Sequence, residues 1–230
     1  MKIFVSIIIP TLNEADSIIP TLDALKPFAG ETEIIIVDGG SIDETEAIAG
    51  GYGVRVLRVG RGRGTQMHAG ANAANGEILW FLHADTIAPI LAVEQIKKAM
   101  ADEKTVGGNF TICFDGEHRA ARFLTWFYPQ LGRIGLCYGD SAVFVRRTIY
   151  EKIGGFQPFP LFEDLDFIKR LKRAGRFVNL AEKVTTSSRR FENRSFTLTF
   201  ARWSILQIFY WFGISPFALA KLYYPIRKNK

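Results

Sequence analysis

The sequence has only two cysteines, Cys113 and Cys137, and neither has a second Cys or a closely spaced His beside it. Such isolated cysteines support neither a disulfide framework nor a zinc site. The sequence also lacks internal repeats and low-complexity tracts. Its first residues, MKIFVSIIIPT, contain a single Lys and no small-residue cleavage site, which argues against a signal peptide. These absences favour a protein of the reducing cytoplasm.

Hydrophobicity and charge indicate a folded protein. Of the 230 residues, 48% are hydrophobic and 23% are charged, so the chain can bury a large core and is too apolar to be disordered. Its length favours one domain with an appendage. The formal net charge of +6 suits nucleic acid, an anionic membrane surface or a phosphorylated ligand. Because the Lys and Arg residues are scattered rather than gathered in a stripe, nucleic acid is not the expected partner.

Short apolar runs alternate with segments of helical spacing. Strands are expected over residues 3–9, 34–37, 54–57 and 78–82, and helices over residues 18–25, 45–49, 66–74 and 91–100. Near-continuous apolar runs are typical of strands buried on both faces, and Pro20 is expected to bend or shorten the first helix. The alternation predicts a Rossmann-like, doubly wound, mostly parallel α/β sheet with helices on both faces.

Polar residues follow three of these strands at the point where each strand ends. The stretches are PTLNE at 10–14, DGGSID at 38–43 and HAD at 83–85. Each stretch alone is explained by turns or helix caps. The carboxyl ends of parallel strands share one edge of the sheet, however, and ligands bind there. Three converging stretches therefore favour a ligand site.

Five stretches of the sequence carry a family resemblance. They are SIIIPTLNE, EIIIVDGGSIDET, GRGRGTQMHAGANAANGEILWFLHADT, GDSAVFVRR and GGFQPFPLFEDLDFIKRLKRAG. In this order and spacing they resemble glycosyltransferase family 2 enzymes with the GT-A fold, over residues 6–190. With the tail SSRRFENRSF, the pattern is most similar to a bacterial subgroup commonly labelled arsenosugar-biosynthesis-type glycosyltransferases. The resemblance implies an inverting transfer of a sugar from a nucleotide-sugar, usually a UDP-sugar, to an acceptor that it leaves unidentified.

The resemblance also implies the donor site. Asp38 would accept hydrogen bonds from the base, and Arg61 and Arg63, in a flexible glycine-rich stretch, would contact phosphate; a plain surface loop is the other interpretation of that stretch. The implied nucleotide and donor contacts are Pro10, Thr11, Asn13, Glu14, Asp38, Gly39, Arg61, Arg63, His83, Ala84, Arg189 and Arg190. Asp85 matches the last Asp of the family's D-x-D motif and would bind Mn²⁺ or Mg²⁺. His83 replaces the first Asp, where it would either hydrogen-bond or pack.

The segment FEDLD at 162–166 supplies the expected base. Its acids precede an amphipathic helix, so they would lie in the first helical turn, where compensation of the helix dipole is the alternative explanation. The family's E-D motif makes Asp164 the base, with Glu163 in support and Asp166 as second choice. Gly139 and Asp140 would orient the donor sugar or the acceptor. The presence of both Asp85 and Asp164 argues against a nucleotide-binding module without catalysis.

Residues 196–230 form the expected appendage to a catalytic domain of residues 1–195. Their longest uncharged run, 203–220, reaches the length of a membrane span, but Gln207, Gly213, Ser215 and Pro216 interrupt it. Two short amphipathic helices are expected, lying on the cytoplasmic face of a membrane or packed on the catalytic domain. A surface for homo-oligomer formation and a simple core cover are the alternatives.

Overall fold

The computed structural model describes residues 4–116, 118–133, 136–189 and 195–223. The strands are β1 (Val5–Thr11), β2 (Thr32–Asp38), β3 (Arg55–Arg58), β4 (Ile78–Phe81), β5 (Thr86–Ile87), β6 (Thr105–Phe114), β7 (Phe144–Arg146) and β8 (Arg176–Thr186). The α-helices are α1 (Ala15–Leu25), α2 (Thr45–Gly51), α3 (Arg63–Ala73), α4 (Ala92–Met100), α5 (Arg119–Arg133), α6 (Arg147–Lys152), α7 (Glu163–Ala174), α8 (Phe196–Trp211) and α9 (Pro216–Tyr223).

One sheet organises the fold, in the order β3-β2-β1-β4-β7-β6-β8-β5. Strands β3, β2, β1 and β4 are parallel, whereas β7 is antiparallel to both of its neighbours and β5 is antiparallel to β8. The predicted mostly parallel α/β sheet is therefore confirmed. Burial on both faces is wrong for the third predicted strand, because β3 lies at the sheet edge and exposes Arg55 and Arg58.

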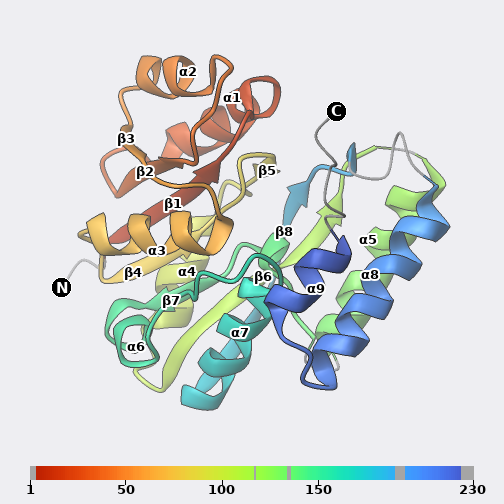
Figure 1. The fold of residues 1–230 in the computed structure, drawn as a ribbon. Coiled ribbons are helices and arrows are strands. Elements are labelled where there is room, and N and C mark those ends of the chain that lie inside the picture. Colours follow the sequence, from red (N-terminus) through yellow and green to blue (C-terminus); the bar gives the residue numbers. More distant parts are fainter. Residues whose placement is uncertain (1–3, 117, 134–135, 190–194, 224–230) are drawn as a thin grey trace.

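Helices cover both faces of the sheet, as Figure 1 shows. Side chains of α1, α2 and α4 pack in the core on one face, and those of α3, α6 and α7 pack on the other. The predicted shortening of α1 is wrong: the helix continues through Pro20, which lies on its exposed side. The carbonyl that proline leaves without a donor can therefore be hydrated.

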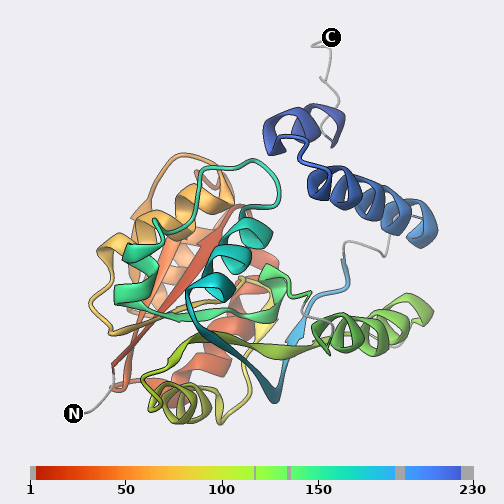
Figure 2. The same ribbon diagram turned by 90° about the horizontal axis from the view of Figure 1, so that it is seen from below.

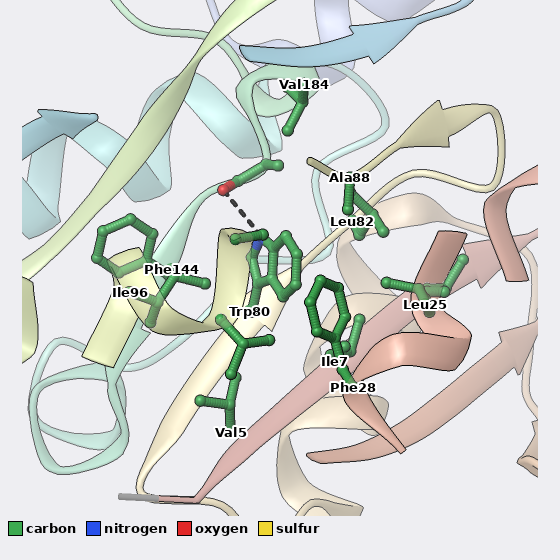
Figure 3. Close-up of a cluster of buried hydrophobic side chains, with 14 of the residues drawn as sticks. Val5, Ile7, Leu25, Phe28, Trp80, Leu82, Ala88, Ile96, Phe144 and Val184 are labelled. Atoms are coloured by element: carbon green, nitrogen blue, oxygen red, sulfur yellow. Dashed lines mark hydrogen bonds between the residues drawn. The ribbon is translucent and has the colours of Figure 1, made fainter. Parts of the chain in front are cut away.

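Trp80 anchors the strand that leads to the HAD stretch. Its side chain is fully buried in β4, and its indole N–H donates to the carbonyl of Ala142 at 3.2 Å, as drawn in Figure 3. Phe28 packs edge-on against the same ring, with the ring centroids 6.5 Å apart. Since Ala142 follows the turn that contains Asp140, Trp80 fixes two predicted site segments relative to each other.

Helices α5, α8 and α9 project beyond the sheet, as Figure 2 shows. Ser195 caps α8 by accepting a hydrogen bond from the Leu198 N–H at 3.5 Å. Of the four predicted interruptions, only that at Gln207 is wrong, because α8 continues through it. The chain turns at Gly213, where φ is 87°, and α9 begins at Pro216, as predicted. Within the described ranges, no helix is long and apolar enough to cross a membrane.

The tail helices pack on the rest of the molecule at two places, and at the first of these Phe196 and Phe200 of α8 pack against a cluster from β6 and α5. The second place lies before α7. Leu206 of α8 and Leu219 of α9 are buried against Leu161 and Phe162, which immediately precede α7. The other large apolar side chains of α8 are spread around the helix, several of them exposed, so a single amphipathic stripe is wrong for α8. A domain boundary at residue 195 stays a prediction.

Candidate active site

A cavity of about 900 Å³ opens at the carboxyl ends of β1 and β4. The predicted site residues that line it are Pro10, Thr11, Glu14, Arg61, Arg63, His83, Ala84, Asp85, Asp140, Glu163 and Arg189. Six predicted residues do not line it, namely Asn13, Asp38, Gly39, Gly139, Asp164 and the second-choice base Asp166, and Arg190 lies outside the described residues. Two of the three polar stretches, 10–14 and 83–85, therefore line one cavity, whereas no residue of the stretch 38–43 lines it.

Asp38 ends β2 as predicted, but its carboxylate is turned away from the cavity. It is fully buried and accepts hydrogen bonds from the hydroxyls of Thr11 and Ser41, at 3.0 and 2.5 Å, and from the N–H groups of Gly40 and Ser41, at 2.8 and 2.7 Å. Burial would raise the pKa of Asp38, yet these hydrogen bonds outweigh burial and lower it. A direct contact with a base, as predicted, would have to replace one of these bonds.

Asn13 and Gly39 shape the loops around the cavity instead of lining it. The Asn13 side chain accepts from the Ile42 N–H at 2.9 Å, and the Asn13 N–H donates to Ser41 Oγ at 2.8 Å, which ties the β1 and β2 loops together. A Cβ atom on Gly39 would lie 3.1 Å from the side chain of Gln66. These two residues therefore hold the cavity wall in place.

Gln66 also belongs to this wall, although its place in a predicted helical segment was the only indication of it. Its buried amide nitrogen donates to the carbonyls of Thr11 at 2.7 Å and Val37 at 2.8 Å, at the ends of β1 and β2. The helix that carries it begins earlier than predicted, at Arg63, so the GRGRG stretch is only partly a loop. Gly62, with a φ of 143°, forms the turn into α3.

Asp85 meets a cation at the cavity edge. Arg189 Nη2 lies 3.2 Å from Asp85 Oδ2 and 2.5 Å from Glu14 Oε2, so one guanidinium bridges two predicted donor-site carboxylates. Burial would lower the pKa of Arg189, but Glu14 and Asp85 outweigh it and raise the pKa. The pairing of β5 with β8 brings Arg189 here: the Thr86 and Thr186 hydroxyls are 3.1 Å apart, and the Ser187 N–H donates to the Asp85 carbonyl.

The donor set around Asp85 fits a divalent metal that is shared with a diphosphate. No group of three or more His, Cys, Asp or Glu able to hold a metal occurs among the described residues, so the protein alone offers an incomplete ligand set. Mg²⁺ commonly takes only one or two carboxylates and completes its shell with phosphate oxygens and water. The Arg189 guanidinium beside Asp85 shows that this position accommodates positive charge.

Carboxylates from two segments meet at the start of α7. Glu163 is buried and paired with Arg63, and the Gly139 N–H donates to Asp164 Oδ2 at 2.7 Å. His83 Nδ1 lies 3.1 Å from Asp140 Oδ1, which answers the open question about His83: it forms a polar contact. The sequence-predicted catalytic residues Asp140, Glu163 and Asp164 are thus brought together.

Burial and neighbouring charge perturb this cluster. Burial, then the charges of Glu163 and Asp140, raise the pKa of Asp164 against the opposing effects of Arg63 and the Gly139 N–H. Burial would lower the pKa of Arg63, but the carboxylates of Glu163, Asp164 and Asp140 together raise it. Asp164 is therefore a carboxylate with a raised affinity for a proton, next to a guanidinium that stays charged.

The pattern of residues 6–154 matches the family described as Glycosyl transferase family 2, over more than half of the chain. The chain belongs to glycosyl transferase family 2. The matched range includes Asp38, Asp85 and Asp140 but ends before α7, so it leaves the roles of Glu163 and Asp164 untested. The arsenosugar-biosynthesis-type subgroup stays a prediction.

This family 2 glycosyltransferase has relatives that are longer than itself. It is 25% identical over 215 residues to "Probable glycosyltransferase YdaM" of Bacillus subtilis, which covers 79% of this chain and 50% of that protein. It is 31% identical over 96 residues to the glucosyl-3-phosphoglycerate synthase of Mycolicibacterium smegmatis, which covers 37% of this chain and 32% of that protein. The chain thus spans half or less of the length of these curated relatives.

Solved structures share the fold of this glycosyltransferase. S. aureus TarS (residues 1–349) in complex with UDP-GlcNAc matches with a TM-score of 0.64 and 16% identity, over 84% of this chain and 60% of TarS. Mycobacterium tuberculosis glucosyl-3-phosphoglycerate synthase in complex with Mn²⁺, UDP and glucosyl-3-phosphoglycerate matches with a TM-score of 0.60 and 23% identity, over 80% and 70% of the two chains. At these identities the likeness establishes the fold, that of GT-A enzymes.

Three residues of the glycosyltransferase adopt left-handed backbone conformations without being glycine. They are Asn13, Ala142 and Phe162, with φ of 55°, 53° and 61°. Asn13 follows β1, Ala142 follows the Asp140 turn, and Phe162 immediately precedes Glu163. Such conformations cost free energy and persist where the surrounding structure holds them, often at functional sites. All three lie within two residues of a predicted site position, which supports the assignment of the cavity.

Asp166, the second choice for the base, lies on another side of α7. Its Oδ2 accepts from Arg170 Nη2 at 2.6 Å and Nε at 2.9 Å, and Arg170 also donates to the carbonyls of Ile153 and Gly155. Asp166 does not line the cavity. Its contacts give it a structural role in holding the loop after α6.

Proposed function

We propose that this chain is an inverting, metal-dependent glycosyltransferase that moves a hexosyl or similar sugar from a UDP-sugar to an acceptor hydroxyl. The observation that carries the proposal is a single cavity lined both by Asp85 at the end of β4 and by the carboxylates of Asp140 and Glu163. Complexes of fold relatives with UDP-GlcNAc and with Mn²⁺ and UDP support the choice of donor.

Donor binding uses the residues at the ends of β1 and β4. Thr11 and Glu14 line the nucleoside, and Arg61 and Arg189 contact the diphosphate with guanidinium groups, which are well suited to phosphate. To do so, Arg189 turns from Asp85 toward the diphosphate. Asp85 would then hold Mn²⁺ or Mg²⁺, and the metal would supply positive charge for the leaving diphosphate.

Asp164 acts as the general base, and because its side chain does not line the cavity, it would have to turn from the Gly139 N–H toward the acceptor to do so. Its raised pKa brings its proton affinity closer to the operating pH, which is what a base requires. Glu163 is less suited to the role, because the Arg63 guanidinium already engages its carboxylate. Asp164 takes the proton of the acceptor hydroxyl while that oxygen bonds to the anomeric carbon and the carbon–oxygen bond to the diphosphate breaks. Attack opposite the leaving group turns an α-linked donor into a β-linked product.

The cytoplasm is the proposed compartment, with the acceptor unidentified. Both cysteines carry free thiols in the structure, which suits a reducing environment.

The cavity wall away from β1 and β4 is apolar and aromatic, formed by Phe114, Tyr128, Pro160, Leu161, Trp203 and Tyr223. An acceptor bound there would contact rings and an aliphatic side chain beside its reacting hydroxyl.

Titration of UDP into the protein with and without Mn²⁺ tests the proposal. Asp85→Asn removes the carboxylate proposed to hold the metal, so the gain in UDP affinity from Mn²⁺ should fall by about 10–100-fold, the range seen when support of a bound metal is lost. Asp102→Asn is the matched control, since Asp102 is an exposed acid paired with Arg176 and does not line the cavity. Unchanged Mn²⁺-dependent UDP binding by the Asp85 variant would refute the metal site. Tight UDP binding by wild type without release of UDP from UDP-sugars would favour the silent nucleotide-binding module.

A further inference from the structure

Exposed apolar side chains gather on the helices that project beyond the sheet. Among the described residues, fifteen large hydrophobic side chains are exposed, and eleven of these lie on α5, α8, α9 and the turn between α8 and α9. We call the outer faces of these helices the helical surface. Its most exposed members include Phe212 at 83%, Leu198 at 73% and Trp126 at 63%. A patch of this extent on one part of a protein marks an interaction surface.

The charges on the same segments all have one sign. Residues 119–133 and 195–230 contain eight Lys and Arg residues and no Asp or Glu, so all 23 acidic residues of the chain lie elsewhere. Arg119, Arg122, Arg202 and Lys221 are exposed on the described helices. A second copy of the chain would bring cations against cations, whereas an anionic apolar partner complements both the charge and the hydrophobicity.

The lengths of the helices limit how such a partner can be engaged. Helix α8 has 16 residues, which at about 1.5 Å per residue is shorter than the roughly 30 Å of a bilayer's hydrocarbon core. Trp126 and Trp211 are among the exposed residues, and Trp is enriched where membrane meets water. Helices of this kind lie in the headgroup region rather than across the bilayer.

We propose that the helical surface docks onto an anionic lipid bilayer. The docked helices also supply Tyr128, Trp203 and Tyr223 to the apolar wall of the cavity, so docking would bring the cavity to the membrane surface. Membrane binding itself does not depend on the proposed function. The consequence that acceptor hydroxyls of membrane lipids come within reach of the cavity does rest on the proposed function.

Flotation with vesicles of phosphatidylcholine and phosphatidylglycerol in a 7:3 ratio, at low salt, tests the proposal with the full chain. Wild-type protein should float with these vesicles, and vesicles of phosphatidylcholine alone should bind at least about a hundredfold more weakly, because each Lys or Arg near an anionic surface contributes to binding. Phe212→Gln should weaken binding to the mixed vesicles by about tenfold or more, since it removes one large inserted side chain. Ile90→Gln is the matched control, because Ile90 is 72% exposed but lies before α4.

Three further readings make the outcome decisive. The emission of exposed tryptophans should shift to shorter wavelength with mixed vesicles, and UDP binding with Mn²⁺, measured on the same samples, should be equal in wild type and both variants. A wild-type protein that does not float, or floats equally with neutral vesicles, overturns the proposal. A protein that does not float but changes from dimer to monomer on Phe212→Gln, by sedimentation velocity, assigns the helical surface to self-association instead. If the wild-type protein does not bind UDP, that result would count against the proposed function, and the conclusion from flotation would be unaffected.

Discussion

Replacing Asp164 by asparagine should remove most of the turnover and yet raise the thermal stability. The variant keeps the size of the side chain, and its amide oxygen can still accept from the Gly139 N–H, which donates to Asp164 at 2.7 Å. What disappears is a charge that burial, Glu163 and Asp140 all disfavour. A base acts in the transition state, so its loss costs about 10²–10⁴ in turnover, whereas donor binding should change little.

The stability change follows from linkage between protonation and folding. Because the pKa of Asp164 is raised in the folded state, ionisation of this group costs stability as the pH rises through the folded pKa. Each unit of pKa difference corresponds to about 1.4 kcal/mol, and 1 kcal/mol moves the Tm of a chain of this size by about 2–4 °C. The Tm of the variant should thus exceed that of wild type at neutral pH, by about 3–6 °C for each pKa unit. The difference in Tm between the variant and the wild type should shrink as the pH falls toward 3.8, the ordinary pKa of an aspartate side chain.

Asp166→Asn provides the matched control in the same helical turn. Asp166 is paired with Arg170 at 2.6 Å, so its neutralisation should cost about 1 kcal/mol and lower the Tm by about 2–4 °C, with turnover nearly unchanged. Thermal unfolding from pH 4 to 8 measures the Tm, and UDP release from a UDP-sugar that the wild-type protein turns over measures the turnover. A lower Tm for Asp164→Asn at pH 7 would refute the argument from burial, and full turnover in that variant would remove Asp164 as the base.

Two further predictions concern helix α3 and the metal edge. A Cβ atom on Gly64 would lie 2.3 Å from the Gln157 carbonyl oxygen, so Gly64→Ala should destabilise the protein by about 1–3 kcal/mol. Gly50→Ala is the control, since Gly50 faces open space on α2, and it should stabilise the protein by about 0.5–1 kcal/mol. Denaturant titration should show free energies of unfolding that change in opposite directions, and equal changes would contradict the close approach at Gly64. Arg189→Gln should strengthen the binding of Mn²⁺ alone, because the guanidinium competes with the metal for Asp85. The same variant should weaken the binding of UDP in the presence of Mn²⁺ about tenfold, because a guanidinium contact to phosphate is lost. Calorimetry that shows both affinities changing in the same direction would refute these two roles of Arg189.

The sequence predicted where the cavity lies because the apolar pattern determines it. A short run such as ILWFL, rich in aromatic and apolar residues, is typical of a buried strand, so the residues after it were expected at the sheet edge, and Asp85 lies there. The helix start at Glu163 followed in the same way from helical spacing. These are local properties, and local properties are what a single sequence records.

The contacts within the cavity were beyond reach because they join distant parts of the chain. Arg63 pairs with Glu163 and His83 with Asp140, and no spacing rule connects residues so far apart. Orientation was equally hidden: a motif gives the position of Asp38 but not the inward turn of its carboxylate. Phe162 in a left-handed conformation goes against its own preference, so only tertiary packing accounts for it.

The pairing of β5 with β8 determines when the site can be completed during synthesis. Thr86 follows Asp85 directly, yet its partner Thr186 is 100 positions later. At roughly 5–20 residues per second, a ribosome needs on the order of 5–20 s to supply that partner. In the first part of this interval β1 to β4 can already form a sheet, but β7 (Phe144–Arg146), which pairs with β4, has not yet been made, so the edge of β4 is open to other chains. The contact between Arg189 and Asp85 therefore forms only late in synthesis, well after β1 to β4 have left the ribosome.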